Sequence, residues 1–281
     1  MNELTTCSHL LQPTTQLGSL GPVCRLGLAT RSESALTAAD VRHAIDRGIN
    51  YLNWCGHPDG MSQAVAELGV RRESVAVAVQ LESASPDEAT RELDRLLLEL
   101  GTDYVDVVTY YYVEHEQEWA TIIEPGGAHE AMLRARAAGK LRLIGVTSHQ
   151  RPLAVRMAQS GMLDLLMIRY NAAHRGAERD IFPITDPLGV PVVAYTCLRW
   201  GALLGSTPDD PPGFVPPSAP NCYRFVLSCP SVAIAIMSPN DRRELDQDLT
   251  IIDRWEPPSP TEYAALVAHG DRVHRHAGSF P

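Results

Sequence analysis

The feature that most constrains the fold is a regular alternation between short, β-rich apolar runs and longer stretches with helical spacing. Eight runs predict strands, near residues 23–28, 50–54, 75–80, 104–110, 142–147, 164–170, 192–195 and 232–237. Eight stretches predict the helices that follow them, at residues 37–47, 61–68, 86–100, 129–138, 152–160, 177–188, 219–228 and 241–252, with one more helix at 262–276. Strand and helix therefore alternate along almost the whole chain.

This order predicts an α/β fold, namely a single-domain (β/α)8 TIM barrel. Buried parallel strands read as continuous apolar runs, and a right-handed helical crossover is the common way to join them. An open, doubly wound sheet is the alternative, but the glycine-rich turn GxGxxG expected after its first strand is missing. We expect residues 1–20 to be an N-terminal extension, residues 21–281 to form the barrel with its C-terminal helix, and residues 206–220 to form a loop over the barrel mouth.

Charge and cysteine usage limit the partners of this chain. Its 24 basic and 34 acidic residues give a formal charge of -10, which repels nucleic acid and anionic lipid. No uncharged apolar stretch reaches the length of about 18 to 20 residues that a membrane span needs. The six cysteines show no CxxC pair and no metal-finger spacing, so we expect reduced thiols and a cytoplasmic protein.

Lysine is almost absent from the sequence. Nearly all of the basic charge is arginine, and the only lysine is Lys140. Any chemistry that needs an active-site lysine must therefore use that residue.

Several segments together resemble the aldo-keto reductase superfamily. They are GLAT at 27–30, RGINYLN at 47–53, LGTDYVDVV at 100–108, GKLRLIGVTSH at 139–149, RYNAAHRGAERD at 169–180, GVPVVAYTCLRWGALLG at 189–205 and YRFVLSCPSVAIAIMSPNDRRELDQDL at 223–249. Members of this superfamily are (β/α)8 barrels that bind a nicotinamide dinucleotide without a Rossmann domain. The resemblance therefore implies a barrel with an NADP or NAD cofactor.

The resemblance also implies an unusual catalytic centre. A typical member has an Asp after strand two, a Tyr five residues later, a Lys at the end of strand three and a His at the end of strand four. The corresponding positions here are Asn53, Pro58, Gln80 and Tyr111. Proline has no proton to give, and an uncharged glutamine cannot lower the pKa of a phenol as a lysine does. The resemblance thus implies a divergent member without the usual proton relay.

Four residues are the catalytic candidates, namely Asn53, His57, Gln80 and Tyr111. An imidazole donates or accepts a proton near neutral pH, so His57 is one candidate proton donor. Tyr111 is the other, as a phenol that hydrogen-bonds to a substrate oxygen. We expect Tyr110 and Tyr112 to pack at the barrel rim, because side chains alternate in and out along a strand.

The cofactor-binding residues follow from the same resemblance. Thr147 and Ser148 correspond to polar side chains against the nicotinamide carboxamide, and Tyr195 to an aromatic ring on the nicotinamide face. The remaining candidates are Asn171, Cys197, Leu198, Ser238, Arg242 and Arg243. Either arginine could pair with a 2'-phosphate, which favours NADP over NAD.

The substrate is expected to be a small molecule that contacts residues at the carboxyl ends of the strands. The candidates are Trp54, His149, Arg169 and His174. Arg169, with Arg175 and Arg199, gives the mouth a positive potential that suits an anionic substrate or the phosphates of the dinucleotide. The scattered histidines have no metal-ligand spacing, so no metal is expected, and the oligomeric state stays open.

These observations favour NAD(P)H-dependent reduction of a carbonyl, or the reverse reaction, with a non-standard proton donor. The sequence also leaves two alternatives. One is a lyase, hydrolase or isomerase that uses His57, Asp59, Tyr111 and His149 as acid and base groups. The other is a catalytically inactive, ligand-binding homologue.

Overall fold

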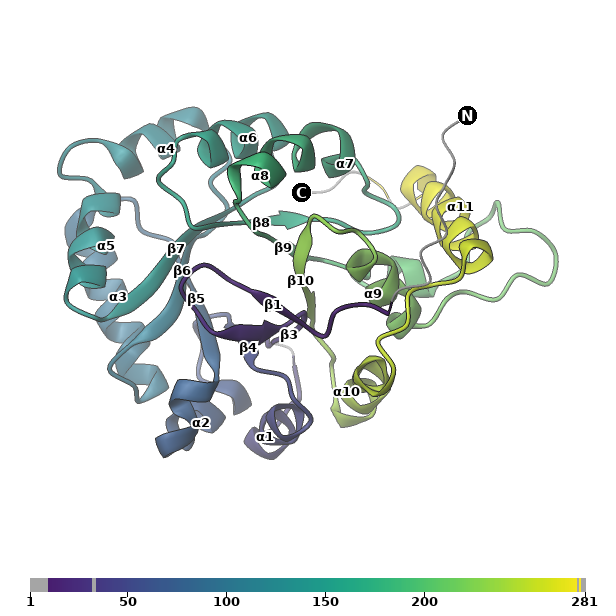
Figure 1. Cartoon of the computed structure of the whole chain (residues 1–281), viewed down its shortest axis with the longest axis horizontal. Helices are drawn as coiled ribbons and strands as arrows, with labels where there is room; N and C mark the ends of the chain where they lie inside the picture. Colours follow the sequence, from purple (N-terminus) through teal and green to yellow (C-terminus); the bar gives the residue numbers. More distant parts are fainter. Residues whose placement is uncertain (1–9, 32–33, 277, 279–281) are drawn as a thin grey trace.

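Eight parallel strands close into a barrel in the computed structural model, which describes residues 10–31, 34–276 and 278. The barrel strands are β3 (Leu26–Ala29), β4 (Tyr51–Trp54), β5 (Ala76–Leu81), β6 (Val105–Tyr110), β7 (Leu141–Ser148), β8 (Leu165–Arg169), β9 (Val192–Tyr195) and β10 (Val232–Met237). Each strand pairs with the next along the chain, and β10 pairs with β3 to close the ring. Figure 1 shows the strands at the centre with helices around them.

The helices cover the outside of the barrel. They are α1 (Ala38–Asp46), α2 (Gly60–Ala66), α3 (Pro86–Leu100), α4 (Glu116–Ile123), α5 (Ala128–Ala137), α6 (Arg151–Gln159), α7 (Ala177–Asp180), α8 (Phe182–Leu188), α9 (Ala219–Leu227), α10 (Arg242–Asp248) and α11 (Pro260–His276). Short 3₁₀ turns lie at Gly69–Ser74, Ala202–Leu204 and Leu249–Asp253. The predicted (β/α)8 barrel is therefore confirmed.

Strand residues alternate between two apolar layers. Tyr51, Ala78 and Met167 belong to the cluster that fills the barrel, whereas Leu52 and Trp54 belong to the cluster between the strands and the helices. Both faces of each strand are buried, which explains why the strands read as continuous apolar runs. This alternation also decides which residues at the strand ends face the barrel axis.

Several element boundaries differ from the prediction. The helix expected at 177–188 is two helices, α7 and α8, because Pro183 has no backbone N–H for a continuous helix. Helix α4 was not predicted. The helix expected at 241–252 ends at Asp248 and continues as the 3₁₀ turn Leu249–Asp253.

A hairpin closes the amino end of the barrel. Strands β1 (Thr14–Gln16) and β2 (Pro22–Cys24) pair antiparallel, and Leu17, Leu20 and Val23 pack into the barrel interior from this hairpin. The strand expected at 23–28 is therefore split between β2 and β3. The proposed boundary at residues 20/21 falls inside the hairpin, and it stays a prediction.

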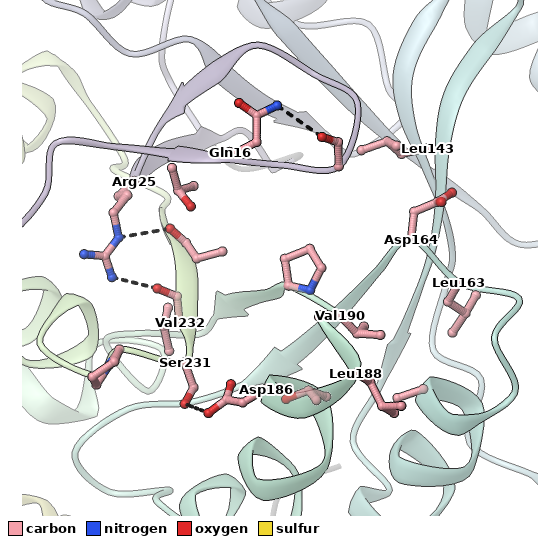
Figure 2. Close-up of a pocket in the computed structure, with 18 of the residues that line it drawn as sticks. Gln16, Arg25, Leu143, Leu163, Asp164, Asp186, Leu188, Val190, Ser231 and Val232 are labelled. Carbon is pink, nitrogen blue, oxygen red and sulfur yellow. Dashed lines mark hydrogen bonds between the residues drawn. The ribbon is translucent and has the colours of Figure 1, made fainter.

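The amino end also carries a cavity of about 1220 Å³ between the hairpin and the start of the strands (Figure 2). Arg25 donates to the carbonyl oxygens of Leu227, Val232 and Ala233 at 2.7–3.2 Å. The Ser231 hydroxyl donates to Asp186 at 2.6 Å. These polar groups are therefore engaged with other parts of the chain.

Helix α11 packs beside the carboxyl end of the barrel. Gly270 lies so close to the backbone of Ala172 that a Cβ atom would stand 2.1 Å from its carbonyl oxygen. On the other side, His269 Nε2 lies 3.0 Å from the Leu203 oxygen, and Arg272 donates to Asp210 at 2.5 Å. The helix thus holds both the loop after β8 and the long loop after β9.

Candidate active site

A cavity of about 670 Å³ opens at the carboxyl end of the barrel. Its lining residues come from the ends of β3, β4, β5, β8, β9 and β10 and from the loops that follow β4, β6 and β9. Pro217 and Ser218, from the loop predicted over the mouth, also line it. Active sites of (β/α)8 barrels lie at this end, so this cavity is the candidate site.

All four catalytic candidates from the sequence line the cavity, namely Asn53, His57, Gln80 and Tyr111. Asn53 and Gln80 face inward because they share strand parity with Tyr51 and Ala78. The Asn53 side chain is 2% exposed, and its Oδ1 has no hydrogen-bond partner among the described residues. A buried acceptor without a partner at a cavity wall is a feature that a ligand can satisfy.

His57 lies in the loop between β4 and α2. Its side chain is exposed, and its carbonyl oxygen accepts a hydrogen bond from Trp54 Nε1 at 2.9 Å. Asp59 then caps α2 by accepting from the Ser62 backbone N–H. The loop is therefore fixed at both ends while the imidazole stays in solvent.

Tyr112 is a cavity residue that the sequence analysis missed. It has a φ of 47°, in the left-handed region that a non-glycine residue enters at a cost of about 1–2 kcal/mol. Because of this turn, its ring packs on the cluster inside the barrel, and it lines the cavity beside Tyr111. The expectation of simple rim packing is therefore wrong for Tyr112. No pattern in the sequence marks a left-handed tyrosine.

Aromatic and polar side chains surround Tyr112. Its ring centroid lies 4.0 Å from that of Tyr111, 4.5 Å from that of His149 and 6.2 Å from that of Tyr195. The His149 ring is stacked on Tyr112 at an interplanar angle of 21°. A hydrogen bond between the two tyrosine side chains raises the pKa of Tyr111 and lowers that of Tyr112, although burial raises both pKa values more strongly.

His149 is held by Glu114. Its backbone N–H donates to Glu114 Oε1 at 2.7 Å, and its Nδ1 lies 3.3 Å from the same oxygen. Burial lowers the pKa of His149, and the nearby Glu114 carboxylate opposes that shift. A histidine whose pKa lies below its usual range is neutral at pH 7. The His149 ring stacks on the Tyr112 ring, and His149 does not itself line the cavity.

The cofactor candidates divide into two groups. Tyr195, Cys197, Leu198, Ser238 and Arg243 line the cavity. The hydroxyl of Tyr195 is buried and has no hydrogen-bond partner among the described residues. These five residues therefore form one wall of the cavity, which runs from β9 to the start of α10.

Thr147, Ser148 and Asn171 lie outside this wall. The Thr147 hydroxyl is buried and has no partner in the part of the chain that the structure describes. The Ser148 hydroxyl accepts from the Gln150 backbone N–H at 3.1 Å. These positions place Thr147 in the barrel interior and Ser148 at the last position of β7.

The assignment of Asn171 needs correction. Its side-chain amide donates to the Thr196 carbonyl oxygen at 2.8 Å, and its Oδ1 accepts from the backbone N–H groups of Ala173 and His174. With no exposed surface, Asn171 ties the loop after β8 to the loop after β9. In this structure Asn171 therefore holds two loops of the barrel rim together.

The assignment of Arg242 also needs correction. Its guanidinium pairs with Asp246 at 2.9 Å and with Asp40 at 3.2 Å, on the side of α10 that faces α1. Arg243, by contrast, lines the cavity and is 82% exposed at the side chain. Helical neighbours point about 100° apart, so only one of two adjacent arginines can face the cavity.

Asp248 is a second cavity residue that was not singled out from the sequence. It is 2% exposed, and burial raises its pKa to about 8, with the charge of Glu244 acting in the same direction. It has no ion pair among the described residues. The α10 end of the cavity therefore contains a buried carboxyl group that resists ionisation.

The substrate candidates do not line the cavity. Trp54 is wrong for this role, because it has no exposed surface and packs between the strands and the helices. The other three candidates, His149, Arg169 and His174, lie at the rim of the barrel. Arg169 is at the end of β8 and faces inward, and its register partner on β9 is Tyr195. Burial lowers the pKa of His174 to about 3, and the charges of Arg169 and Arg199 add to this shift.

The single lysine lies far from the cavity in the fold. Lys140 directly precedes β7 at the amino end of the barrel, where its Nζ donates to Asp94 at 2.6 Å. Strand β7 separates it from the carboxyl end. The mouth of the barrel therefore contains no lysine.

The described residues form neither a metal centre nor a membrane span. No group of three or more His, Cys, Asp or Glu side chains in the described ranges is arranged to hold a metal ion. None of the helices formed by these residues has the length and apolarity needed to cross a membrane.

Known proteins resemble this chain in sequence. It is 29% identical over 175 residues to the NADH-specific methylglyoxal reductase of Escherichia coli (strain K12), which covers 54% of this chain and 52% of that protein. It is 24% identical over 210 residues to the uncharacterized oxidoreductase YrpG of Bacillus subtilis (strain 168), covering 64% and 62%. The matched regions thus span only about half to three fifths of these relatives.

Solved structures resemble it in fold. An aldo-keto reductase from Klebsiella pneumoniae in complex with NADPH has a TM-score of 0.74 at 22% identity, covering 93% of this chain and 96% of that one. The holo form of an aldo-keto reductase from Bacillus halodurans has the same TM-score at 17% identity. The model of the Aldo/keto reductase family matches residues 24–222. With most of the barrel inside that match, the chain belongs to the aldo/keto reductase family.

Proposed function

We propose that this protein is an NAD(P)H-dependent oxidoreductase that reduces a carbonyl group of a small molecule. The observation that carries the proposal is one continuous cavity, which runs from Asn53, Gln80 and Tyr111 at the strand ends to Ser238 and Arg243 at α10. Its volume of about 670 Å³ lies within the range of about 300–1,000 Å³ that ligand sites usually have. The named relatives support the same chemistry, since one is an NADH-specific reductase and one structure contains NADPH.

The residues of the cavity fit a dinucleotide. Tyr195 offers an aromatic face at the end of β9, and its hydroxyl and Asn53 Oδ1 are buried atoms that await a partner. Ser238 and Arg243 offer a hydroxyl and a guanidinium to phosphate oxygens at the other end. A bound nicotinamide dinucleotide would supply the hydride. Asn53 and Gln80 would orient the carbonyl by hydrogen bonds.

We further propose that the reaction proceeds without the proton relay of typical members. Asn53, Pro58, Gln80 and Tyr111 stand at the four family positions, and Lys140 lies at the opposite end of the barrel. A proton must then come from a hydroxyl or an imidazole in the cavity. His57 and Tyr111 are the donors that the sequence suggests.

The compartment that we propose is the cytoplasm. The five described cysteines, Cys24, Cys55, Cys197, Cys222 and Cys229, are free thiols, which is typical of a reducing environment. A substrate with an anionic group fits the arginines of the rim, Arg169 among them.

The first experiment is a titration of the purified protein with NADH and with NADPH, followed by nucleotide fluorescence. We expect saturable binding, and then oxidation of the bound nucleotide by methylglyoxal or by another member of an aldehyde and ketone panel. No binding at hundreds of micromolar nucleotide would overturn the oxidoreductase proposal. It would leave the non-redox and ligand-binding alternatives.

A variant tests whether the proposed cavity binds the nucleotide. Tyr195→Ala should weaken nucleotide binding by about 1–2 kcal/mol through lost ring contact. Tyr263→Ala is the matched control, because Tyr263 lies on α11 and stacks on Phe225, away from the cavity lining. Unchanged affinity in Tyr195→Ala would show that the nucleotide binds elsewhere.

A further inference from the structure

The side chains of three consecutive tyrosines at the end of β6 lie in different surroundings. The Tyr110 hydroxyl lies 3.2 Å from His129 Nδ1, in the layer between the barrel and the helices. Tyr111 follows strand alternation and faces the cavity. Tyr112 should face outward by the same rule, but its φ of 47° turns it over the barrel interior.

The turn brings Tyr112 into the cavity together with Tyr111. Its ring is clamped between the Tyr111 ring, 4.0 Å away, and the His149 ring, 4.5 Å away. Residues in a sparsely populated backbone region persist only where their surroundings enforce them, and they concentrate at functional sites. The left-handed backbone of Tyr112, at the wall of the cavity, therefore marks this residue as a candidate for function.

We propose that Tyr112 is the proton donor of this enzyme and that Tyr111 supports it, an inference that rests on the proposed carbonyl reduction. A bound reduced nicotinamide dinucleotide would supply the hydride that forms a C–H bond at the carbonyl carbon. The carbonyl π electrons move to oxygen, and that oxygen takes the proton of the Tyr112 hydroxyl. The products are an alcohol, the oxidised dinucleotide and a Tyr112 phenolate, which then regains a proton from water.

The geometry favours Tyr112 over Tyr111 as the donor to substrate, because the Tyr112 ring is held between the Tyr111 and His149 rings. The Tyr111 phenol lies beside it, so its hydroxyl can donate a hydrogen bond to the Tyr112 oxygen. When Tyr112 loses its proton, the Tyr111 hydroxyl stabilises the phenolate. Tyr111 thus takes over part of the task that a lysine performs in typical members.

Charged groups around Tyr112 act in both directions. Burial raises its pKa most, Tyr111 lowers it, and Cys55 and Glu114 raise it. Arg169 lowers it through its positive charge from the end of β8. The groups that face Tyr112 from the neighbouring elements also include His149 on the loop after β7 and Tyr195 on β9. Arg169 is therefore the cation that favours the phenolate.

His57 is a weaker candidate for the same role. Its side chain is exposed in the loop between β4 and α2, where water competes for its protons. Tyr112 is partly buried against the barrel interior. A donor that is held in place delivers its proton in a defined direction, which an exposed imidazole does not.

The three tyrosines allow a graded test with phenylalanine variants. Tyr112→Phe should lower kcat by about 10²–10⁴-fold, the usual contribution of a positioned acid. Tyr111→Phe should lower it by roughly tenfold, because one hydrogen bond to the developing phenolate is lost. Tyr110→Phe is the matched control and should stay within about twofold of the wild type, because its hydroxyl points away from the cavity.

The readouts separate catalysis from folding. We expect the NADH dissociation constant and the Tm of Tyr112→Phe to stay close to those of the wild type, because the phenyl ring keeps its stacking. We also expect a solvent isotope effect on kcat in the wild type, and this effect should change only in the Tyr111 and Tyr112 variants. Full activity of Tyr112→Phe in a protein whose wild type reduces carbonyls would overturn the assignment of Tyr112 alone.

A second measurement keeps the fold intact. Incorporating 3,5-difluorotyrosine, a more acidic phenol, at position 112 should move the alkaline loss of kcat to lower pH, since an acid catalyst fails above its pKa. The same replacement at position 110 should not. An unmoved profile at position 112 would overturn the proposal. A wild type that neither binds nucleotide nor reduces carbonyls would overturn the proposed function and this role together.

Discussion

The two ends of the barrel contain buried aspartates in opposite surroundings. At the amino end, Asp106 pairs with Arg72 at 2.9 Å and Arg142 at 3.3 Å and accepts a hydrogen bond from the Val77 backbone N–H. At the carboxyl end, Asp248 has Glu244 as its charged neighbour, and its pKa is raised to about 8. The carboxylate at the amino end therefore has cationic partners, whereas the carboxyl group at the other end has a raised pKa and an acidic neighbour.

Most other groups follow the same division, although Arg72 Nε and the Tyr104 hydroxyl are buried without hydrogen-bond partners among the described residues near the amino end. Asn53 Oδ1, Thr147 Oγ1 and the Tyr195 hydroxyl are buried without partners among the described residues, and all three lie toward the carboxyl end. Four of the five described non-glycine residues with positive φ lie in the loops after β6 and β9, namely Tyr112, Thr196, Arg199 and Trp200. The larger cavity, about 1220 Å³, is nevertheless at the amino end. Unsatisfied polar groups and left-handed non-glycine residues are therefore more frequent around the candidate site than at the end with the larger cavity.

The largest effect is expected at the amino end. Asp106→Ala should lower the free energy of unfolding by about 3–5 kcal/mol, because it leaves the buried Arg72 without its carboxylate. Urea unfolding measures this change. Glu130→Ala is the control, since it removes an exposed i,i+4 pair with Arg134 and should cost no more than about 0.5 kcal/mol. Equal losses in the free energy of unfolding for the two variants would contradict the idea that the amino end depends on this buried ion pair.

A pH series tests the aspartate at the carboxyl end. The folded-state pKa of Asp248 is raised to about 8, above an unfolded value of about 3.9, so the folded state holds the extra proton between these values. Its stabilising contribution is complete below the unfolded pKa and is lost as the pH rises through 8, at no more than about 1.4 kcal/mol per pH unit. Asp248→Asn should flatten the dependence of Tm on pH from 5 to 8. The exposed Asp87→Asn should leave it unchanged, and identical curves for Asp248→Asn and the wild type would contradict the assignment.

A pair of threonines compares unsatisfied and satisfied hydroxyls. Thr147→Val removes a buried hydroxyl without a partner and should stabilise the chain by about 1 kcal/mol. Thr109→Val removes a buried hydroxyl that donates to the Val79 carbonyl oxygen, and it should destabilise the chain by a similar amount. If Thr147 contacts the nucleotide as proposed, Thr147→Val also weakens its binding. Thermal unfolding with and without NADH measures both effects, and a destabilised Thr147→Val would show that its hydroxyl is satisfied.

The smallest effect concerns the choice of cofactor. Arg243→Ala should weaken NADPH binding by about 0.2–1 kcal/mol, the usual strength of an exposed ion pair, and leave NADH binding unchanged. Arg242→Ala is the control, because Arg242 is engaged with Asp246 and Asp40. An equal loss for both nucleotides in Arg243→Ala would exclude a 2'-phosphate contact. Fluorescence titration gives both affinities.

The sequence predicted the fold and part of the candidate site. Continuous apolar runs predicted the parallel barrel, and the family resemblance indicated Asn53, Gln80 and Tyr111, all of which line one cavity. Strand parity was not applied to Trp54, which shares its face with Leu52 and is buried outside the barrel. That error was therefore avoidable from the sequence.

Tyr112 and Asp248 were beyond the sequence analysis for a different reason. A left-handed backbone at a tyrosine is imposed by the rings around it, and a raised carboxyl pKa depends on burial between distant elements. Asn171 and Arg242 have suitable side chains, but hydrogen bonds and ion pairs to other loops already engage them. Sequence positions alone do not show which polar groups already have partners.

The amino-acid sequence by itself determined the architecture, and it led to the proposal that the ordinary proton relay is missing. Both follow from local properties, namely the apolar period of each strand and the residue types at fixed positions. Only the tertiary structure decided which polar groups remain unsatisfied at the carboxyl end and which tyrosine turns over the barrel axis. Partnership and backbone strain arise from contacts between segments far apart along the chain, and those contacts exist only once the ring has closed.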